Sequence, residues 1–289
     1  MTNEMNLMKK TLKKITKTAC RKACRWIEKN GHSLILNNKD VKLPYLAGII
    51  GGVTEPWMNS VLSQLFKETD GIFIDVGVNL GQTLLHVKTL DPNRPYIGFE
   101  PNPNCCFYVN RLIEYNDFEN TTIVPVGLAD KSGLGVLHFL QDHCHDAAAS
   151  IVEGFRDQSR IQRKVFVPLY DFADYKSVLP DGNVSIIKID VEGAEHLVFK
   201  ALWDVICDQR PVIVLEMLPP GDTESERFER QSKIYSDFIA ADYQVCRISK
   251  SPDSKVVFKK LDKYLPYTEI ELSDYVIIPK ESVNQFNVI

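Results

Sequence analysis

The stretch FIDVGVNLGQ, residues 73–82, decides the fold. An apolar run reaches Asp75, and two glycines follow at Gly77 and Gly81, before a segment whose composition fits a helix. A strand that enters a glycine turn and then a helix is typical of a nucleotide-binding βαβ unit. Glycine allows a tight turn with no Cβ facing the ligand, and the helix N-terminus directs backbone N–H groups toward it. The stretch therefore predicts a nucleotide-like ligand at residues 77–81.

Strand-like and helix-like segments alternate beyond this turn. Strands are expected at 71–76, 96–99, 121–126, 136–140, 165–169, 185–189, 212–216, 244–248, 255–258 and 275–278, and helices at 55–67, 81–89, 104–115, 194–203 and 228–240. This alternation predicts an α/β fold with a mostly parallel sheet covered on both faces. Ligands of such sheets bind outside the carboxyl ends of strands. The site candidates are therefore the polar residues that follow strands: Asp75, Glu100, Asp130, Asp190 and Glu216.

The second strand of the unit ends in YIGFEPNP, which places Glu100 25 residues after Asp75. An acidic side chain at about this distance accepts hydrogen bonds from ribose hydroxyls in βαβ units. The alternative is an acid that interacts favourably with the N-terminus of the following helix. Because the glycine turn precedes it, we predict the ribose role. Pro101 and, at the start of the first expected helix, Glu55 are also predicted to bind the cofactor.

Two features of the turn distinguish a dinucleotide from S-adenosylmethionine. Asn79 stands where the dinucleotide fingerprint has its middle glycine, which a pyrophosphate requires. The carboxylate of Asp75 would repel a pyrophosphate, but it suits the ammonium and sulfonium groups of S-adenosylmethionine. The sequence therefore favours the methyl donor over a nicotinamide dinucleotide. The alternatives are a nicotinamide-dependent oxidoreductase and a non-catalytic, membrane-associated binding module that retains the cofactor fold.

A third motif, KIDVEGAEH at residues 188–196, follows a buried strand. Asp190 and Glu192 come at the strand end, and Glu195 fits an acid in the first turn of the next helix. Asp190 and Glu192 are predicted at the mouth of the site. There they could hold a substrate hydroxyl, the ammonium of the cofactor, or a metal.

The segment QDHCHDAAAS, residues 141–150, offers candidate bases in a predicted loop. His143 and His145 are flanked by Asp142 and Asp146, and a histidine beside carboxylates titrates in the working range of a base. The same pattern could bind a metal, and it also fits a solvated polar loop. We predict one of the two histidines as the base and assign no metal ligand. His196 is predicted to be a surface or packing residue.

Five pieces in order, DVGVNLGQ, FEPNP, VGLAD-x-x-G, PLYDF and KIDVEGAE, resemble the FkbM-type methyltransferases. The resemblance covers roughly residues 55–279, and KIDVEGAE is its most specific part. It implies a class I, Rossmann-like methyltransferase fold, with a mostly parallel seven-stranded sheet, helices on both faces and an antiparallel C-terminal strand. It also implies transfer of a methyl group from S-adenosylmethionine, usually to a hydroxyl on a sugar or a natural product.

The resemblance assigns roles residue by residue. The cofactor loop corresponds to Asp75, Gly77, Asn79 and Gly81, and the ribose-binding acid to Glu100. Asp130 falls near the expected adenine position, and Asp190 and Glu192 match the carboxylates beside the transferred methyl group. Two positions depart from the family pattern. Val78 replaces a small residue, and Tyr170 stands where the pattern has no aromatic residue.

The whole chain has 289 residues, of which 44% are hydrophobic and 25% charged, with a net charge of −4. Residues 1–29 hold nine Lys or Arg against two Glu, a local charge of +7, so the remainder carries −11. Apolar residues in 5–29 recur at three- and four-residue steps, which predicts a basic amphipathic helix. This helix could pack on the protein or on a second subunit, contact an anionic membrane, or touch nucleic acid, in descending order of preference. We expect a 1–50 extension that includes a short strand pair, and a 51–289 methyltransferase domain.

The seven scattered cysteines fit reduced thiols in the cytoplasm rather than a disulfide framework. No apolar signal region or run of about 18 apolar residues is visible, so neither a signal peptide nor a membrane span is predicted. The expected partner is a small-molecule or glycan acceptor, with no nucleic acid. Pairing with a second copy of the chain stays open, and the basic N-terminal helix leaves peripheral membrane contact open.

Overall fold

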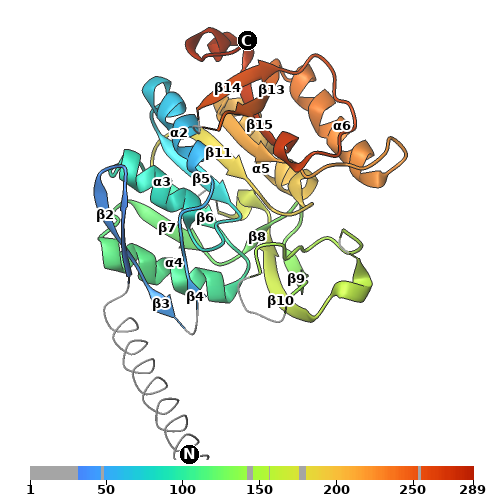
Figure 1. Ribbon diagram of the computed structural model, residues 1–289. Helices are drawn as coiled ribbons and strands as arrows, with labels where there is room; N and C mark the ends of the chain where they lie inside the picture. The colour runs from blue at the N-terminus through green and yellow to red at the C-terminus, as the bar shows by residue number, and fades with distance from the viewer. Residues whose placement is uncertain (1–31, 47–48, 142–145, 156, 176–179, 253–254) are drawn as a thin grey trace, which may run out of the picture.

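An eight-stranded sheet runs through the centre of the protein (Figure 1). This computed structural model describes residues 32–46, 49–141, 146–155, 157–175, 180–252 and 255–289. The sheet order is β14-β13-β15-β12-β11-β5-β6-β7. The basic helix expected at 5–29 lies outside the described residues.

Five neighbouring strands of this sheet are parallel. They are β7 (Thr121–Val124), β6 (Tyr96–Phe99), β5 (Ile72–Val76), β11 (Val184–Ile189) and β12 (Val212–Glu216). The late strand β15 (Asp274–Pro279) pairs antiparallel with both β12 and β13 (Tyr243–Lys250). The predicted class I fold with seven strands is therefore present, and β14 (Val256–Lys260) adds an eighth strand at the edge beside β13.

The chain order changes direction at β5. From β5 it proceeds outward through β6 to β7, and it later returns to β11 on the other side of β5. Such a switch point leaves a crevice at the carboxyl ends of the strands, because the two flanking connections leave on opposite faces. Asp75, Glu100 and Asp190 all lie at this edge of the sheet, as predicted from the strand ends.

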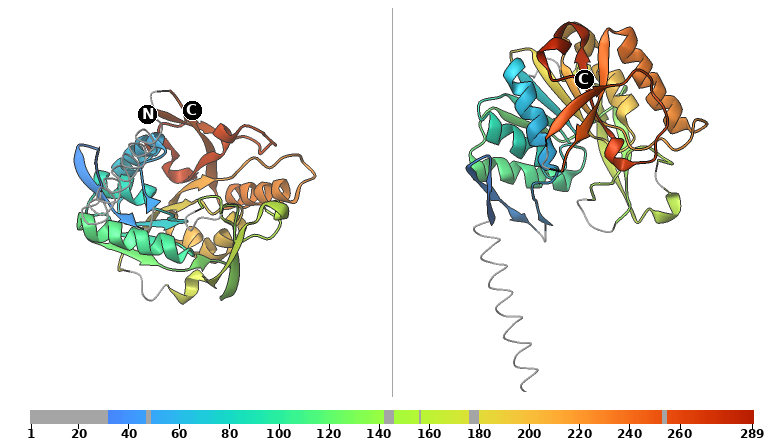
Figure 2. Two further views of the ribbon diagram at one scale, coloured as in Figure 1. Left: turned by 60° about the horizontal axis from the view of Figure 1, so that its bottom comes forward. Right: turned by 45° about the horizontal axis from the view of Figure 1, so that its top comes forward.

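Helices cover both faces of the sheet (Figure 2). On one face lie α2 (Pro56–Glu68), α3 (Gln82–Leu90) and α4 (Pro103–Asn116), and on the other lie α5 (Glu195–Gln209) and α6 (Glu226–Ala240). Phe73 of β5 packs in the first core, and its neighbours Ile72 and Ile74 pack in the second. Both faces of the parallel strands are thus apolar, as a doubly covered sheet requires. No helix within the described ranges is both long and apolar enough to cross a membrane.

A separate three-stranded sheet lies between β7 and β11 in the chain. It consists of β8 (Gly127–Leu128), β9 (Gly133–Phe139) and β10 (Arg163–Tyr170), with β9 antiparallel to β10. Leu137 and Val167 of this sheet are buried, whereas Leu134 and Phe166 are exposed. This alternation is typical of an antiparallel sheet with one covered face. The expected strands at 136–140 and 165–169 therefore exist, but they do not join the main sheet.

The hairpin of β1 (His32–Leu36) and β2 (Lys39–Leu43) is the predicted short strand pair. Its turn residues Asn37 and Asn38 have φ of 52° and 61°, a left-handed conformation that asparagine tolerates. The Asn37 side chain donates to Asn59 Oδ1 at 2.7 Å, which fixes the hairpin to α2. Shorter elements complete the fold: β3 (Tyr45–Leu46), β4 (Ile49–Ile50), and 3₁₀ turns at Gln158–Arg160, Phe172–Asp174, Ile270–Leu272 and Lys280–Gln285.

Candidate functional site

A cavity of about 330 Å³ lies at the switch point, at the carboxyl ends of β5, β6 and β11. Its size falls within the usual range of small-molecule sites. One part of the wall is apolar and includes Val78, Phe99, Leu128, Leu137 and Ile151. Another part carries carboxyl groups, from Glu55, Glu100, Asp146, Asp190, Glu192 and Glu216. A cavity with this division can hold a ligand that has an aromatic end and a polar or positively charged end.

The glycine turn forms part of this wall, and its two glycines are also needed for packing, a reason that the sequence did not show. Gly77 has φ of 90°, and a Cβ there would lie 1.9 Å from the carbonyl oxygen of Asp190. Gly81 has φ of 82°, and its Cβ would lie 2.9 Å from Leu112 of α4. Both glycines therefore allow close packing of the turn against other parts of the chain.

Asn79 takes the place of the missing middle glycine because it, too, lies in the left-handed region, with φ of 49°. Its backbone N–H donates to Glu100 Oε2 at 2.8 Å. The Cys105 thiol donates to Asn79 Oδ1 at 3.6 Å. The turn is thus connected directly to the acidic residue at the end of the next strand. The unusual Val78 fits over β6, because Gly98 leaves room there for its side chain.

Glu100 is buried in the cavity wall just after β6. Its other carboxyl oxygen accepts the backbone N–H of Asn102 at 2.7 Å. Burial raises the pKa of Glu100 to about 7, although the two backbone N–H groups oppose this shift. A carboxylate has about four lone-pair positions, so two further donors can bind this group. The remaining lone pairs can accept hydrogen bonds from hydroxyl groups of a ligand.

Asp75 is fully buried beneath the turn, and it is not among the described residues that line the cavity. The Tyr96 hydroxyl donates to its Oδ2, and Lys188 Nζ lies 3.7 Å from its Oδ1. Burial raises the pKa of Asp75, and Lys188 and the Tyr96 hydroxyl lower it, with a net shift upward. Lys188 was not among the residues predicted from the sequence. The signal for it was present as one lysine within the apolar strand SIIKI.

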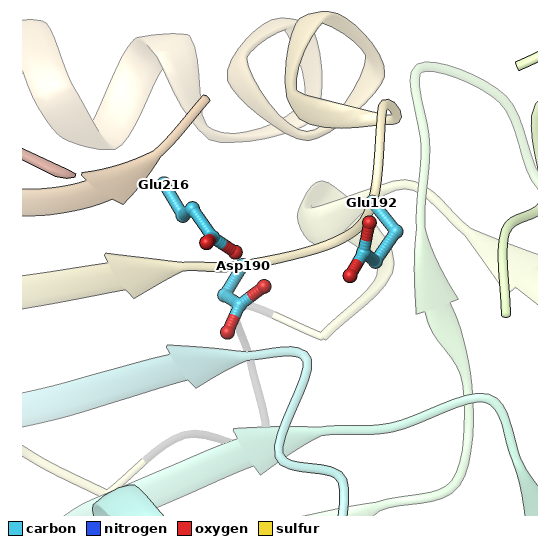
Figure 3. Close-up of side chains that lie close together, drawn as sticks. All are labelled: Asp190, Glu192 and Glu216. Atoms are coloured by element: carbon cyan, nitrogen blue, oxygen red, sulfur yellow. The ribbon is translucent and has the colours of Figure 1, made fainter. Parts of the chain in front are cut away.

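Three carboxyl groups gather on the other side of β5 (Figure 3). Asp190 and Glu192 follow β11, Glu216 ends β12, and one carboxyl oxygen from each lies within 4.8 Å of the other two. Glu216 and Asp190 share a hydrogen bond. Burial and the charge of Asp190 raise the pKa of Glu216 well above its ordinary value. Within the described ranges, this is the group of side chains placed closely enough to hold a metal ion.

Three of the nine described non-glycine residues with a left-handed backbone conformation lie in the cavity wall. Glu55, Asn79 and Glu192 have φ of 55°, 49° and 51°. Such conformations cost on the order of 1–3 kcal/mol for a residue with a side chain, and they are concentrated in functional sites. Glu55 precedes α2, and burial raises the pKa of its carboxyl group. Pro101 also lines the cavity.

The segment 146–155 covers Glu192 and its neighbours. Ser150 Oγ donates to the Glu192 carbonyl oxygen at 2.6 Å, and the ring of Phe155 lies against Gly193. Asp146 Oδ2 accepts the backbone N–H groups of Leu140 and Gln141 at 2.7 and 3.0 Å, which shapes this segment. The predicted bases His143 and His145 lie outside the described residues.

Two further predicted residues lie away from the cavity wall. Asp130 forms an ion pair with Lys200 at 3.3 Å, with about a third of its side chain exposed. Glu195 accepts the Gly193 backbone N–H at 2.7 Å, as expected for an acid in the first turn of α5. Burial raises the pKa of Glu195 to about 7.

Comparison with known proteins identifies the family of this chain. The sequence profile described as the methyltransferase FkbM domain matches residues 75–265, which is more than half of the chain. Methyltransferase sdnD from Sordaria araneosa is 26% identical over 176 residues, which are 51% of this chain and 67% of that protein.

Two solved structures are similar in fold. Methyltransferase FkbM from Methylobacillus flagellatus KT has a TM-score of 0.48 at 12% identity, over 78% of this chain and 48% of that chain. This chain thus spans about half the length of that protein. An O-methyltransferase from Bacillus cereus in complex with SAH has a TM-score of 0.43 at 10% identity, over 76% of this chain and 78% of that one. The profile match confirms the resemblance seen in the motifs. The chain belongs to the FkbM methyltransferase family, whose methyl donor is S-adenosylmethionine.

Proposed function

We propose that this protein transfers the methyl group of S-adenosylmethionine to a hydroxyl oxygen on a small-molecule acceptor, a sugar or another natural product. The main support is that carboxyl groups line the cavity on both sides of β5. Glu100 lies on the β6 side, with lone pairs left for hydroxyl groups, and Asp190 and Glu192 lie on the β11 side. One cavity thus provides a ribose-binding acid and, next to it, acceptors for a second ligand.

The described residues fit the methyl donor. Glu100 would accept hydrogen bonds from the ribose hydroxyls, and the 77–81 turn with Asn79 would lie against the methionine part. Glu55 and Pro101 line the same cavity. Asp75 would act from beneath the turn, because Lys188 and Tyr96 already occupy its carboxylate. Asp130 would act at the outer margin, near the adenine position. The bound donor supplies a methyl group activated by its sulfonium charge.

The acceptor would bind at Asp190 and Glu192, which can orient a hydroxyl group by accepting its hydrogen bond. Transfer to a hydroxyl also requires removal of its proton. We assign that step to His143 or His145, because both belong to the segment that leads into Asp146, and Asp146 lines the cavity. A histidine has the pKa that this step needs near neutral pH.

Isothermal titration tests the first half of this proposal. S-adenosylhomocysteine should bind the pure protein with one-site behaviour, and the absence of any binding would refute the proposal. The acceptor class is tested by transfer of a labelled methyl group to a panel of sugars and polyols. His143→Ala and His145→Ala should each keep cofactor binding. If both variants also keep full turnover, neither histidine is the base.

Cofactor binding should strengthen as the pH rises through 7. Glu100 accepts ribose hydroxyls best as a carboxylate, and burial raises its pKa from 4.5 to about 7. Only about a tenth of the group is ionised one pH unit below that value, and about nine-tenths one unit above. We therefore expect the Kd for S-adenosylhomocysteine to fall several-fold between pH 6 and 8. Titration calorimetry at both values checks this, and Glu100→Gln should remove the dependence.

We also propose an acceptor class, a compartment and contacts for residues 5–29. The acceptor is a small molecule or glycan rather than nucleic acid, and the chain works in the cytoplasm. Residues 5–29 would contact a membrane surface or a second copy of the chain. Their charge and apolar periodicity support both of these roles.

A further inference from the structure

Lys188 is the only Lys or Arg among the described residues that line the cavity, and six of the other lining residues carry carboxyl groups. It is 6% exposed and pairs directly across from Asp75 in the β11–β5 register. Its Nζ lies 3.7 Å from Asp75 and 3.1 Å from Asp190. One ammonium group therefore contacts a carboxylate beneath the turn and a carboxylate in the cavity wall.

The position of Asp190 depends on this contact. Its carboxyl group lies after the end of β11, where it interacts with the side chains of Lys188 and Glu216. Lys188 comes from the rigid strand itself, two residues earlier. A side chain held by an ion pair from a buried strand loses rotamer freedom, so it is pre-organised for a ligand. Glu216 alone would draw the carboxyl group toward β12.

A purely structural role is the alternative. Asp75 is fully buried, and within the described part of the chain its Oδ1 has no hydrogen-bond partner. An uncompensated buried carboxylate is strongly destabilising. Lys188 could therefore serve only to neutralise Asp75, with its contact to Asp190 having no effect on ligands. The two roles predict different effects on binding once the charge of Asp75 is removed together with that of Lys188.

We propose that Lys188 is a positioning residue that holds the Asp190 carboxylate in the cavity wall, and that Asp190 in this position makes the cavity prefer the positively charged methyl donor to its neutral-sulfur product. The inference rests on the proposed function, because it takes the donor to be S-adenosylmethionine. A carboxylate interacts favourably with a sulfonium centre and has no comparable interaction with a thioether. The preference therefore favours exchange of spent product for fresh donor.

The test compares Kd values for S-adenosylmethionine and S-adenosylhomocysteine by titration calorimetry. The double variant Asp75→Asn/Lys188→Met removes both charges of the fully buried pair. The carboxylate that loses its lysine is then Asp190, which is about a third exposed, so circular dichroism should show a folded protein. We expect its preference for the donor over the product to fall about tenfold relative to the wild type. Asp190→Asn, with Lys188 intact, should lower the preference to the same degree, and it provides the test if the double variant does not fold.

A second ion pair, with a buried aspartate, provides the matched control. Lys250 and Asp274 also join a lysine to an aspartate near this edge of the sheet, but neither lines the cavity. Asp274→Asn/Lys250→Met should change the donor-to-product preference by no more than about twofold. If the Lys188 double variant weakens both ligands equally, or Asp190→Asn leaves the preference unchanged, the positioning role is wrong. If the wild type binds neither ligand, the proposed function itself fails.

Discussion

Replacing Gly77 with alanine should destabilise the protein by about 3 kcal/mol or more. The added Cβ would lie 1.9 Å from the Asp190 carbonyl oxygen and 2.9 Å from its carbonyl carbon. The obstructing atoms belong to the backbone, and the two backbones are held close together because β5 and β11 are paired up to this point. Side-chain rotation therefore cannot relieve the clash. The left-handed φ of 90° adds about 1–3 kcal/mol of strain for a residue with a Cβ, and overpacking adds a similar amount.

Urea denaturation measures this effect as a lowered midpoint at constant slope. Gly221→Ala is the matched control. Gly221 has φ of 85°, nearly the same conformation, but none of the described atoms lies within 4 Å of the position that a Cβ would take there. The control should therefore show the conformational cost alone, on the order of 1–3 kcal/mol. Equal losses in the two variants would mean that the contact with Asp190 has no energetic weight. The separation of β5 and β11 would then adjust more easily than we expect.

The edge of the sheet that carries the site was predictable because parallel strands that are buried on both faces read as continuous apolar runs. The polar residue that ends each run then lies at the same edge as the others. Glu100 and Asp190 follow directly from this rule, and both line the cavity. Predicting that these two residues share one edge required no knowledge of long-range contacts. In a parallel sheet the carboxyl ends of all strands lie at the same edge.

Lys188 and the packing of Gly77 against Asp190 were not predictable in the same way. Both depend on which strand lies beside β5, and β11 follows it by more than a hundred residues. Without that pairing, Lys188 is a lysine in an apolar strand, and Gly77 is a flexible turn residue. The small sheet was missed for a related reason. Periodicity shows that β9 and β10 are strands, but it does not show which strands they pair with.

Asp75 illustrates how burial changes a sequence-based role. Its position before the turn predicted direct contact with the cofactor. In the structure Asp75 is buried beneath the turn, where it accepts the Tyr96 hydroxyl and lies 3.7 Å from Lys188 Nζ. Those partners come from the neighbouring strands β6 and β11, and the sequence does not show which strands are neighbours of β5. Ionised carboxyl groups in the cavity wall would also repel a pyrophosphate. There, six carboxyl-bearing residues surround one lysine among the described lining residues.

Glu100→Gln should weaken binding of S-adenosylhomocysteine by about 100-fold. The carboxylate accepts backbone N–H groups from Asn79 and Asn102, one on each oxygen. A glutamine keeps one accepting oxygen, and its NH₂ group must face the other backbone donor. It also offers the ribose hydroxyls no charged acceptor. Two lost hydrogen bonds to a charged group amount to about 3 kcal/mol, which corresponds to about two orders of magnitude in Kd.

Titration calorimetry at pH 8 is the appropriate measurement, since wild-type Glu100, with a pKa of about 7, is then mostly ionised. Glu68→Gln, at the exposed end of α2, is the control for a change of charge elsewhere, and it should bind as the wild type does. Thermal melts of both variants separate a binding defect from unfolding. A loss of less than about threefold in a folded Glu100→Gln protein would show that Glu100 only braces the turn through Asn79. The ribose would then have to be held elsewhere in the cavity wall, and Glu192 would be the next carboxylate to replace, because it lines the same cavity.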